Sequence, residues 1–139
     1  MLLDEVCKFI DDNSTGRETG INLFKSFRHE NTPDTATFVQ EYGGREPALR
    51  MGSSTPFYEL PRIQILERST DYQTARNNAE VWYRLFMGTN NTILKPSTGA
   101  TGTRYLALKP LQSPFSIGID ELERHQIVFN VEAMKSLST

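Results

Sequence analysis

The sequence predicts an α+β fold, in which a single mixed or antiparallel sheet of about five strands carries two helices on one face and long extended loops. Residues 62–68 alternate between apolar and polar side chains, as in a strand with one buried face. Residues 71–87 repeat apolar side chains at helical spacing. The predicted order is helix, strand, strand, loop, strand, helix, strand, strand, which favours helices packed on a sheet.

The predicted strand at 62–68 lies at the centre of the core. Its alternation places Ile63 and Ile65 on the buried face. Arg62 and Arg68 share the other face, where they either contact a partner subunit or only keep an open sheet face soluble.

The helix that follows has clear signals at both ends. Asp71, after Ser69 and Thr70, is a residue type that caps helix starts, because its side-chain oxygen accepts a hydrogen bond from a free backbone N–H. Gly88 is the predicted C-terminal stop. The apolar stripe between them consists of Tyr72, Ala75, Ala79, Trp82, Tyr83 and Phe86.

Residues 2–12 predict a second, amphipathic helix, with Glu5 among the polar residues that face water. Cys7 lies beside its apolar face and is interpreted as a small buried hydrophobe rather than a nucleophile. The remaining predicted strands cover residues 21–27, 36–42, 104–110 and 125–133. Gly43 and Gly44 are expected to end the strand at 36–42.

Two long polar stretches separate these elements. Residues 45–61 contain three prolines and predict a loop or extended arm. Its aromatic residues Phe57 and Tyr58 either contact a partner or fold back on the core. Residues 89–103 are rich in Gly, Ser, Thr and Asn and predict a flexible loop without the GxxxxGK[ST] spacing of a phosphate-binding loop.

The C-terminal third predicts shorter features. Residues 111–118 form a bend around Pro114, and residues 119–124 form one helical turn or a hairpin tip. Val128 breaks the alternation of the last strand, so we expect part of its outer face to be covered. Residues 135–139 are expected to fray.

Composition narrows the function. A chain of 139 residues predicts one domain, residues 1–139, large enough to bury a core. A net charge of −2 argues against a dedicated nucleic-acid binder. A single cysteine excludes an internal disulfide and a thiolate zinc cluster. Neither a signal peptide nor an apolar run long enough to span a membrane is evident, so we expect a protein made in the cytosol.

No catalytic constellation emerges from the sequence, and neither a metal site nor a cofactor is expected. The two histidines, His29 and His125, lack metal-ligand spacing. Asp120 and Glu121 lie beside Arg124 in a short charged segment that is better interpreted as a solvated turn. An alternative function is a small cytosolic enzyme that uses Asp120 or Glu121 with His125 and Arg124.

Three blocks of residues resemble one phage protein family in order and spacing. The first is Tyr42-Gly43-Gly44 with Glu46-Pro47. The second runs from Leu60-Pro61-Arg62 through Gln64 and Arg68 to Asp71-Tyr72, Ala75 and Ala79. The third is Gln112-Ser113-Pro114-Phe115 with Asp120-Glu121 and Arg124. The resemblance covers nearly the whole chain and is to the minor capsid or tail terminator proteins of long-tailed bacteriophages.

This resemblance implies a virion structural protein without catalysis, located at the head-proximal end of the tail and assembled in the host cytoplasm. Tail terminators form a ring, typically a hexamer, that caps the tail tube, stops its polymerisation and presents the surface that joins the head. The implied partners are other copies of the chain, the tail tube protein and the head–tail connector protein. DNA would pass through the lumen without specific binding, and no membrane is involved.

Loop position and residue type suggest five interface residues: Arg45, Arg50, Tyr58, Lys95 and Arg104. The nearest alternative function is a head-completion or connector protein of the same virion. A third alternative is a monomeric binding module that presents residues 45–61 to one partner.

Overall fold

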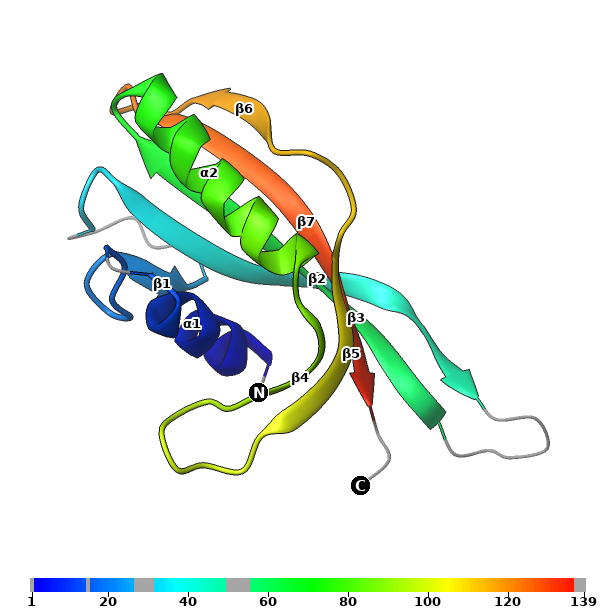
Figure 1. Cartoon of the computed structure of the whole chain (residues 1–139). Coiled ribbons are helices and arrows are strands. Elements are labelled where there is room, and N and C mark those ends of the chain that lie inside the picture. The colour runs from blue at the N-terminus through cyan, green and yellow to red at the C-terminus, as the bar shows by residue number, and fades with distance from the viewer. Residues whose placement is uncertain (1, 15, 27–31, 50–55, 137–139) are drawn as a thin grey trace.

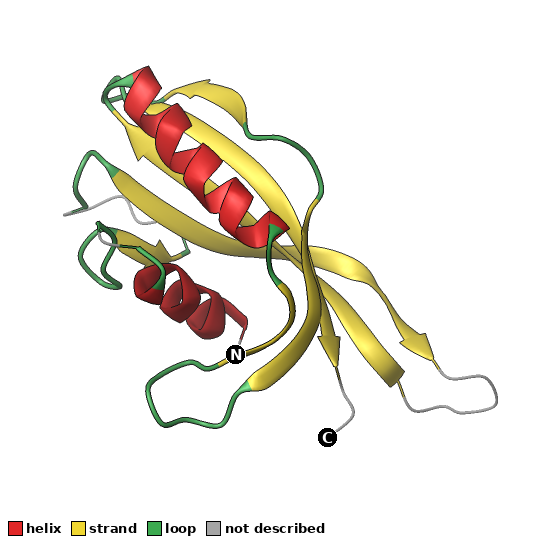
Figure 2. Cartoon of the chain, in the orientation of Figure 1, coloured by secondary structure: helices red, strands yellow, loops and turns green. Residues whose placement is uncertain are grey.

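The computed structural model describes residues 2–14, 16–26, 32–49 and 56–136. The helices are α1 (Leu2–Asp12) and α2 (Tyr72–Met87). The strands are β1 (Leu23–Lys25), β2 (Ala36–Leu49), β3 (Pro56–Ser69), β4 (Asn90–Leu94), β5 (Thr103–Pro110), β6 (Phe115–Ile119) and β7 (His125–Ser136). Figure 1 shows these elements and Figure 2 shows that both helices lie against the curled sheet.

The described strands form one sheet in the order β1-β2-β3-β7-β5-β4, and β6 also pairs with β7. β1 is parallel to β2, whereas the other pairs are antiparallel. The predicted α+β class with two helices and a mixed sheet is therefore confirmed. The predicted number of about five strands is only roughly right, since the described residues contain seven.

β7 organises the sheet although it is the last strand in sequence. One edge of β7 pairs with β3 from His125 to Ser136. Its other edge pairs with β6 at residues 125–128 and with β5 at residues 131–135. β5 and β6 therefore occupy opposite ends of the same edge of β7.

The main core lies between the sheet and the two helices. Ile63 and Ile65 of β3 face this core, as the alternation predicts, and are fully buried. Trp82 and Phe86 of α2 belong to the same cluster, as do Leu2, Val6, Cys7 and Ile10 of α1. Burial of Cys7 was expected. Glu5 was expected to face water, but it is only 1% exposed. Its carboxylate accepts a hydrogen bond of 2.9 Å from the Tyr105 hydroxyl, which offsets part of the cost of burying it.

The central helix follows its sequence signals closely. Asp71 is the N-cap, and its carboxylate accepts a 3.1 Å hydrogen bond from the backbone N–H of Thr74. Gly88 ends α2, and its N–H donates to the carbonyl of Arg84. Tyr72 departs from the predicted stripe: it is 44% exposed and packs edge-on against His125.

In the predicted loop at residues 45–61, residues 45–49 belong to β2 and residues 56–61 to β3, and these two strands form an extended arm (Figure 1). Residues 50–55 lie outside the described residues. β2 continues through Gly43 and Gly44, so the expectation that they end the strand is wrong. The register shifts between Tyr42 and Arg45, which leaves an extra residue in β2 at this point. Pro61 lies opposite this irregularity, where its missing N–H is tolerated.

Gly44 is needed because a Cβ there would lie 2.3 Å from the carbonyl oxygen of Leu60. The two strands can therefore approach each other at the bulge only if this residue lacks a side chain.

Other predicted boundaries also differ. The expected loop at 89–103 contains β4, the expected bend at 111–118 contains most of β6, and β7 extends to Ser136. The strand predicted at 21–27 is only three residues long among the described positions. The predictions for residues 27 and 137–139 lie outside the described residues.

The outer face of the sheet is partly covered, as Val128 suggested. Val128 is buried in a second cluster with Phe24, Ala36, Phe38 and Leu66. Further along this face the side chains are polar, and the amide of Gln64 donates a 3.3 Å hydrogen bond to that of Asn130.

Candidate assembly interface

One end of the molecule is formed by the β4–β5 hairpin and carries two of the predicted interface residues. Ile93 and Arg104 are paired in register on the outward side, and Lys95 follows directly after β4. Lys95 and Arg104 are exposed, and the exposed fractions of Ile93 and Leu106 are 51% and 36%. We call these four residues the basic end.

Buried alternate residues of the β4–β5 hairpin anchor the basic end to the core. Leu94 and Tyr105 point into the core with exposed fractions of 4% and 0%. The guanidinium of Arg104 donates a 2.7 Å hydrogen bond to the side chain of Asn91. The strands that carry the outward side chains are therefore anchored to the core.

The opposite end is formed by β6 and the turn into β7. All five residues of β6 are exposed, and within the described chain β6 pairs only with β7. Ile117, Ile119 and Leu122 have exposed fractions of 51%, 60% and 65%. Glu121 and Glu123 are exposed beside them. We call these five residues the acidic end.

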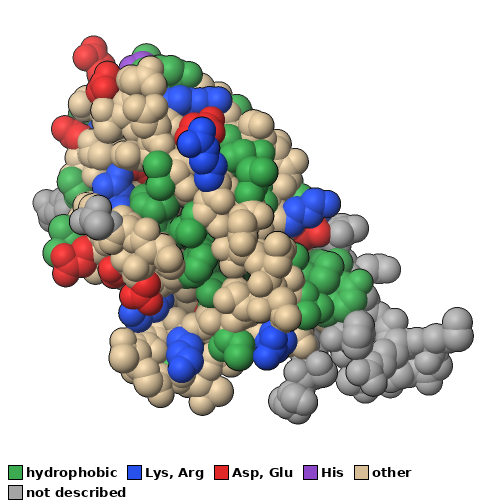
Figure 3. All heavy atoms as spheres, in the orientation of Figure 1, with side chains coloured by type: hydrophobic (Ala, Val, Ile, Leu, Met, Phe, Trp, Pro, Cys, Tyr) green, Lys and Arg blue, Asp and Glu red, His purple; other side chains and the backbone are tan. Residues whose placement is uncertain are grey.

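The two ends lie far apart along the sheet. β6 pairs with the beginning of β7, whereas β5 pairs with its last residues. In Figure 3, acidic side chains lie at the upper left, near the β6–β7 turn, and basic side chains lie at the bottom, near the β4–β5 hairpin, with side chains of both signs between them. Each end thus combines exposed aliphatic side chains with exposed charges. Opposite charges lie close by: Arg76 donates to the carbonyl of Pro114 just before β6, and Asp12 lines the same pocket as Ile93 and Lys95.

The other predicted interface residues do not join this surface. Tyr58 is half-buried in β3, in register with Ala48 and Ser136. Arg45 lies in β2 opposite Leu60. The side chain of Arg45 and the whole of Arg50 lie outside the described residues.

The segment proposed for an alternative enzyme forms a hairpin turn. The carboxylate of Asp120 accepts hydrogen bonds of 3.0 Å from the backbone N–H groups of Leu122 and Arg124, and of 2.8 Å from Nε of Arg124. Burial alone would raise the pKa of Asp120, but these hydrogen bonds hold it below its usual value. Arg124 also lies 3.6 Å from Asp34. Asp120 and Arg124 therefore have structural partners, in the turn itself and, for Arg124, also at Asp34.

Arg62 and Arg68 are both engaged within the chain. Nε of Arg62 donates a 3.0 Å hydrogen bond to Glu132. Arg68 is fully buried over the ring of Phe38, at 4.8 Å from the ring centroid. It donates to the backbone carbonyl of Pro33 at 2.5 Å, and its burial lowers the pKa of the guanidinium. One interpretation of the sequence placed Arg68 on an open face of the sheet. The burial of Arg68 contradicts that interpretation.

A buried carboxylate lies under α2. Glu67 lies on the core-facing side of β3 and is fully buried. Its carboxylate accepts hydrogen bonds from four side chains: Arg17, Thr37, Trp82 at 3.1 Å and Asn78 at 3.3 Å. Burial raises the pKa of Glu67, while Arg17 and the hydrogen bonds oppose that rise. Arg17 also donates to Thr37 at 2.7 Å. This network ties the segment after α1 to the sheet and the helix.

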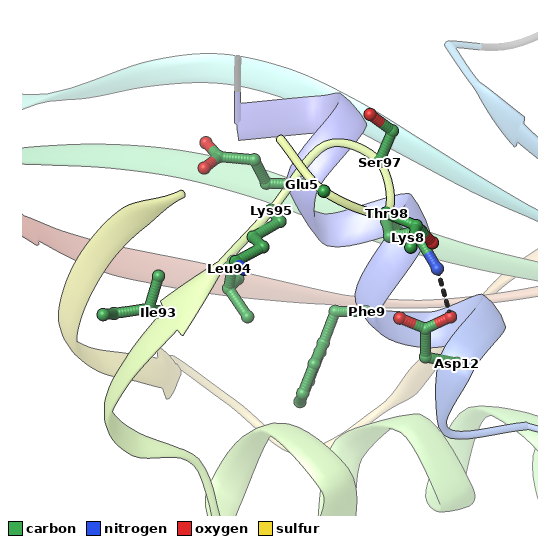
Figure 4. Close-up of a pocket in the computed structure, with 10 residues that line it drawn as sticks. Glu5, Lys8, Phe9, Asp12, Ile93, Leu94, Lys95, Ser97 and Thr98 are labelled. Carbon is green, nitrogen blue, oxygen red and sulfur yellow. Dashed lines mark hydrogen bonds and ion pairs between the residues drawn. The ribbon is translucent and has the colours of Figure 1, made fainter. Parts of the chain in front are cut away.

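A shallow pocket of about 270 Å³ lies between α1 and the segment after β4. Figure 4 shows Lys8 and Asp12 of α1 paired on its rim, where Ser97 and Thr98 of the segment after β4 also lie. Phe9 forms part of its apolar floor. Ile93 and Lys95 of the basic end also line this pocket. Lys8 and Asp12 are paired with each other, so the pocket offers few convergent polar groups for a ligand.

Among the described residues no group of three or more His, Cys, Asp or Glu side chains is placed to hold a metal ion. Neither described helix is long and apolar enough to cross a membrane. No protein-family model matches the chain, and no curated protein is significantly similar to it in sequence.

Sequence reasoning missed the apolar residues of both ends. Ile117 and Ile119 alternate with Ser116 and Gly118, which is a strand pattern that Pro114 obscured. Ile93 lies in a stretch whose polar residues predict a loop. Their exposure was not predictable without the pairing of the strands.

Proposed function

We propose that the chain is a tail terminator of a long-tailed bacteriophage, a virion structural protein without catalytic activity. In this proposal a ring of copies, typically six, caps the tail tube, stops its polymerisation and forms the surface that joins the head. Its partners are the tail tube protein and the head–tail connector protein, and DNA passes through the lumen.

The observation that carries the proposal is the pair of dissimilar exposed ends. A closed ring needs a heterologous contact, in which one surface of each subunit meets a different surface of the next. The acidic end and the basic end are such a pair, since both contain exposed aliphatic residues and their charges are opposite. The resemblance of nearly the whole chain to the terminator family supports the same function.

Two further features are consistent with this role. The β2–β3 hairpin projects from the body of the sheet (Figure 1) and can reach a neighbouring subunit or the tube. The net charge of −2 suits a channel through which DNA slides without being held. Arg45, Arg50 and Tyr58 on or near this hairpin remain proposed contacts, as do Lys95 and Arg104.

Electron microscopy of lysates tests the proposal in a phage that carries an early stop codon in this gene. We expect abnormally long free tails beside filled heads without tails, because nothing stops tube growth. Free tails of normal length beside such heads would favour the head-completion or connector alternative. Intact virions would refute both structural functions.

A further inference from the structure

We propose that the acidic end of one copy binds the basic end of a second copy, head to tail. This inference rests on the proposed ring but names the surfaces that form it. Ile117, Ile119 and Leu122 of one copy would pack against Ile93 and Leu106 of the next.

The composition of the two ends argues for a second copy as the occupant. Each end has at least one aliphatic side chain that is more than half exposed, and charged side chains lie beside it. Glu121 and Glu123 provide two negative charges at one end, and Lys95 and Arg104 provide two positive charges at the other. The chain thus carries both halves of a complementary contact.

The strand pairing argues for a head-to-tail contact. β6 and β5 lie at opposite ends of one edge of β7, so one copy presents the two surfaces in different places. A contact between two acidic ends or two basic ends would place like charges together, which is unfavourable. Contact between unlike ends leaves one acidic end and one basic end unoccupied in the growing assembly. Further copies therefore add until the ring closes.

Two charge-reversed variants test the contact. The first carries Glu121→Lys and Glu123→Lys, and the second carries Lys95→Glu and Arg104→Glu. Sedimentation velocity of the wild-type chain at low salt, up to about 1 mM protein, should reveal assemblies larger than a dimer. Each variant alone should associate at least about 100-fold more weakly, because like charges then face each other.

Mixing the two variants gives the decisive result. In the mixture, the acidic end of the first variant is now positive and can bind the basic end of the second variant, which is now negative. The unchanged basic end of the first variant can bind the unchanged acidic end of the second. The mixture should therefore recover association to within about tenfold of wild type. Misfolding of either variant cannot produce this recovery. Wild-type association should also weaken from 0.1 M to 1 M salt, where the Debye length falls from about 10 Å to about 3 Å.

A matched control carries Glu18→Lys and Glu41→Lys, two exposed carboxylates outside both ends, and should associate like wild type. Three outcomes would overturn the inference: a wild-type monomer at about 1 mM, an assembly that stops at a dimer, or a mixture that stays dissociated. Each leaves the terminator function to be decided separately, because the length of tails in the stop-codon phage does not depend on association in free solution.

Discussion

Replacing Arg17 by Ala should destabilise the protein by about 2–3 kcal/mol. The substitution leaves Glu67 buried without its countercharge, and breaking a buried ion pair typically costs about 3–5 kcal/mol. The Arg17 side chain is 10% exposed, and Thr37, Asn78 and Trp82 still donate to Glu67 after the change. These remaining donors place the expected cost below that range.

The effect should depend on pH with a definite sign. Burial already raises the pKa of Glu67, and loss of Arg17 raises it further. A carboxyl whose pKa is higher in the folded state favours folding below its unfolded pKa of about 4.3 and loses that contribution as pH rises through the folded pKa. The deficit of Arg17→Ala relative to wild type should thus be largest at neutral pH and shrink towards about pH 4.

Urea unfolding measured by fluorescence of Trp82, the single tryptophan, provides the assay. With an m-value of about 2 kcal/mol per M, the midpoint should fall by roughly 1 M. Lys8→Ala is the control, because its pair with Asp12 is exposed and worth about 0.5 kcal/mol or less. A deficit under about 0.5 kcal/mol for Arg17→Ala, or one that grows as pH falls, would refute the reasoning.

Three further predictions concern single positions. Gly44→Ala should destabilise the protein by about 1–3 kcal/mol through overpacking against Leu60. Gly43→Ala is the control and should change the unfolding midpoint far less, because nothing lies within 4 Å of a Cβ at that position. Equal midpoints for the two variants would contradict the close approach at the bulge. Burial raises the pKa of Cys7 to about 12, so at pH 8 a thiol reagent should label it about 10³-fold more slowly than in the urea-unfolded chain; fast labelling of the folded chain would show that the thiol is accessible. Asp71→Ala should lower stability by about 1 kcal/mol in urea unfolding, while Asp71→Asn retains a capping oxygen and most of the stability; a similar loss in both would indicate that the cap is not the cause.

The central helix was predictable because its signals are local. Asp71 and Gly88 lie at its ends, and Ala75, Ala79 and Trp82 repeat at the helical period. Such patterns depend on neighbouring residues only. The alternation of Ile63 and Ile65 identified the centre of β3 for the same reason.

The hairpin arm was not predictable because its sequence contradicts ordinary strand preferences. Pro61 and Gly44 normally argue against a strand, but both are tolerated at the bulge where β2 passes β3. Their tolerance depends on the partner strand, which the local sequence does not contain.

Only the two basic residues of the candidate interface were among the residues predicted from sequence, whereas Glu121 was interpreted as part of a solvated turn. The sequence suggests Lys95 and Arg104 because they are basic residues in or beside a polar stretch, and the structure places both on one hairpin. Ile117 and Ile119 remained unnoticed because an exposed aliphatic residue looks the same in sequence as a buried one. Glu67 carried a usable signal, since a carboxylate in the inward phase of a buried strand requires internal donors.

The position of β7 in the sheet has a consequence for synthesis. β7 is the last described strand to be translated, yet it joins β3 to both β5 and β6. Until β7 emerges from the ribosome, one edge of β3 is unpaired and the apolar face around Ile63 and Ile65 is incompletely covered. Such an edge can pair with other nascent chains. We therefore expect a chain cut before His125 to require chaperones or to aggregate, even though both helices and most strands are already present.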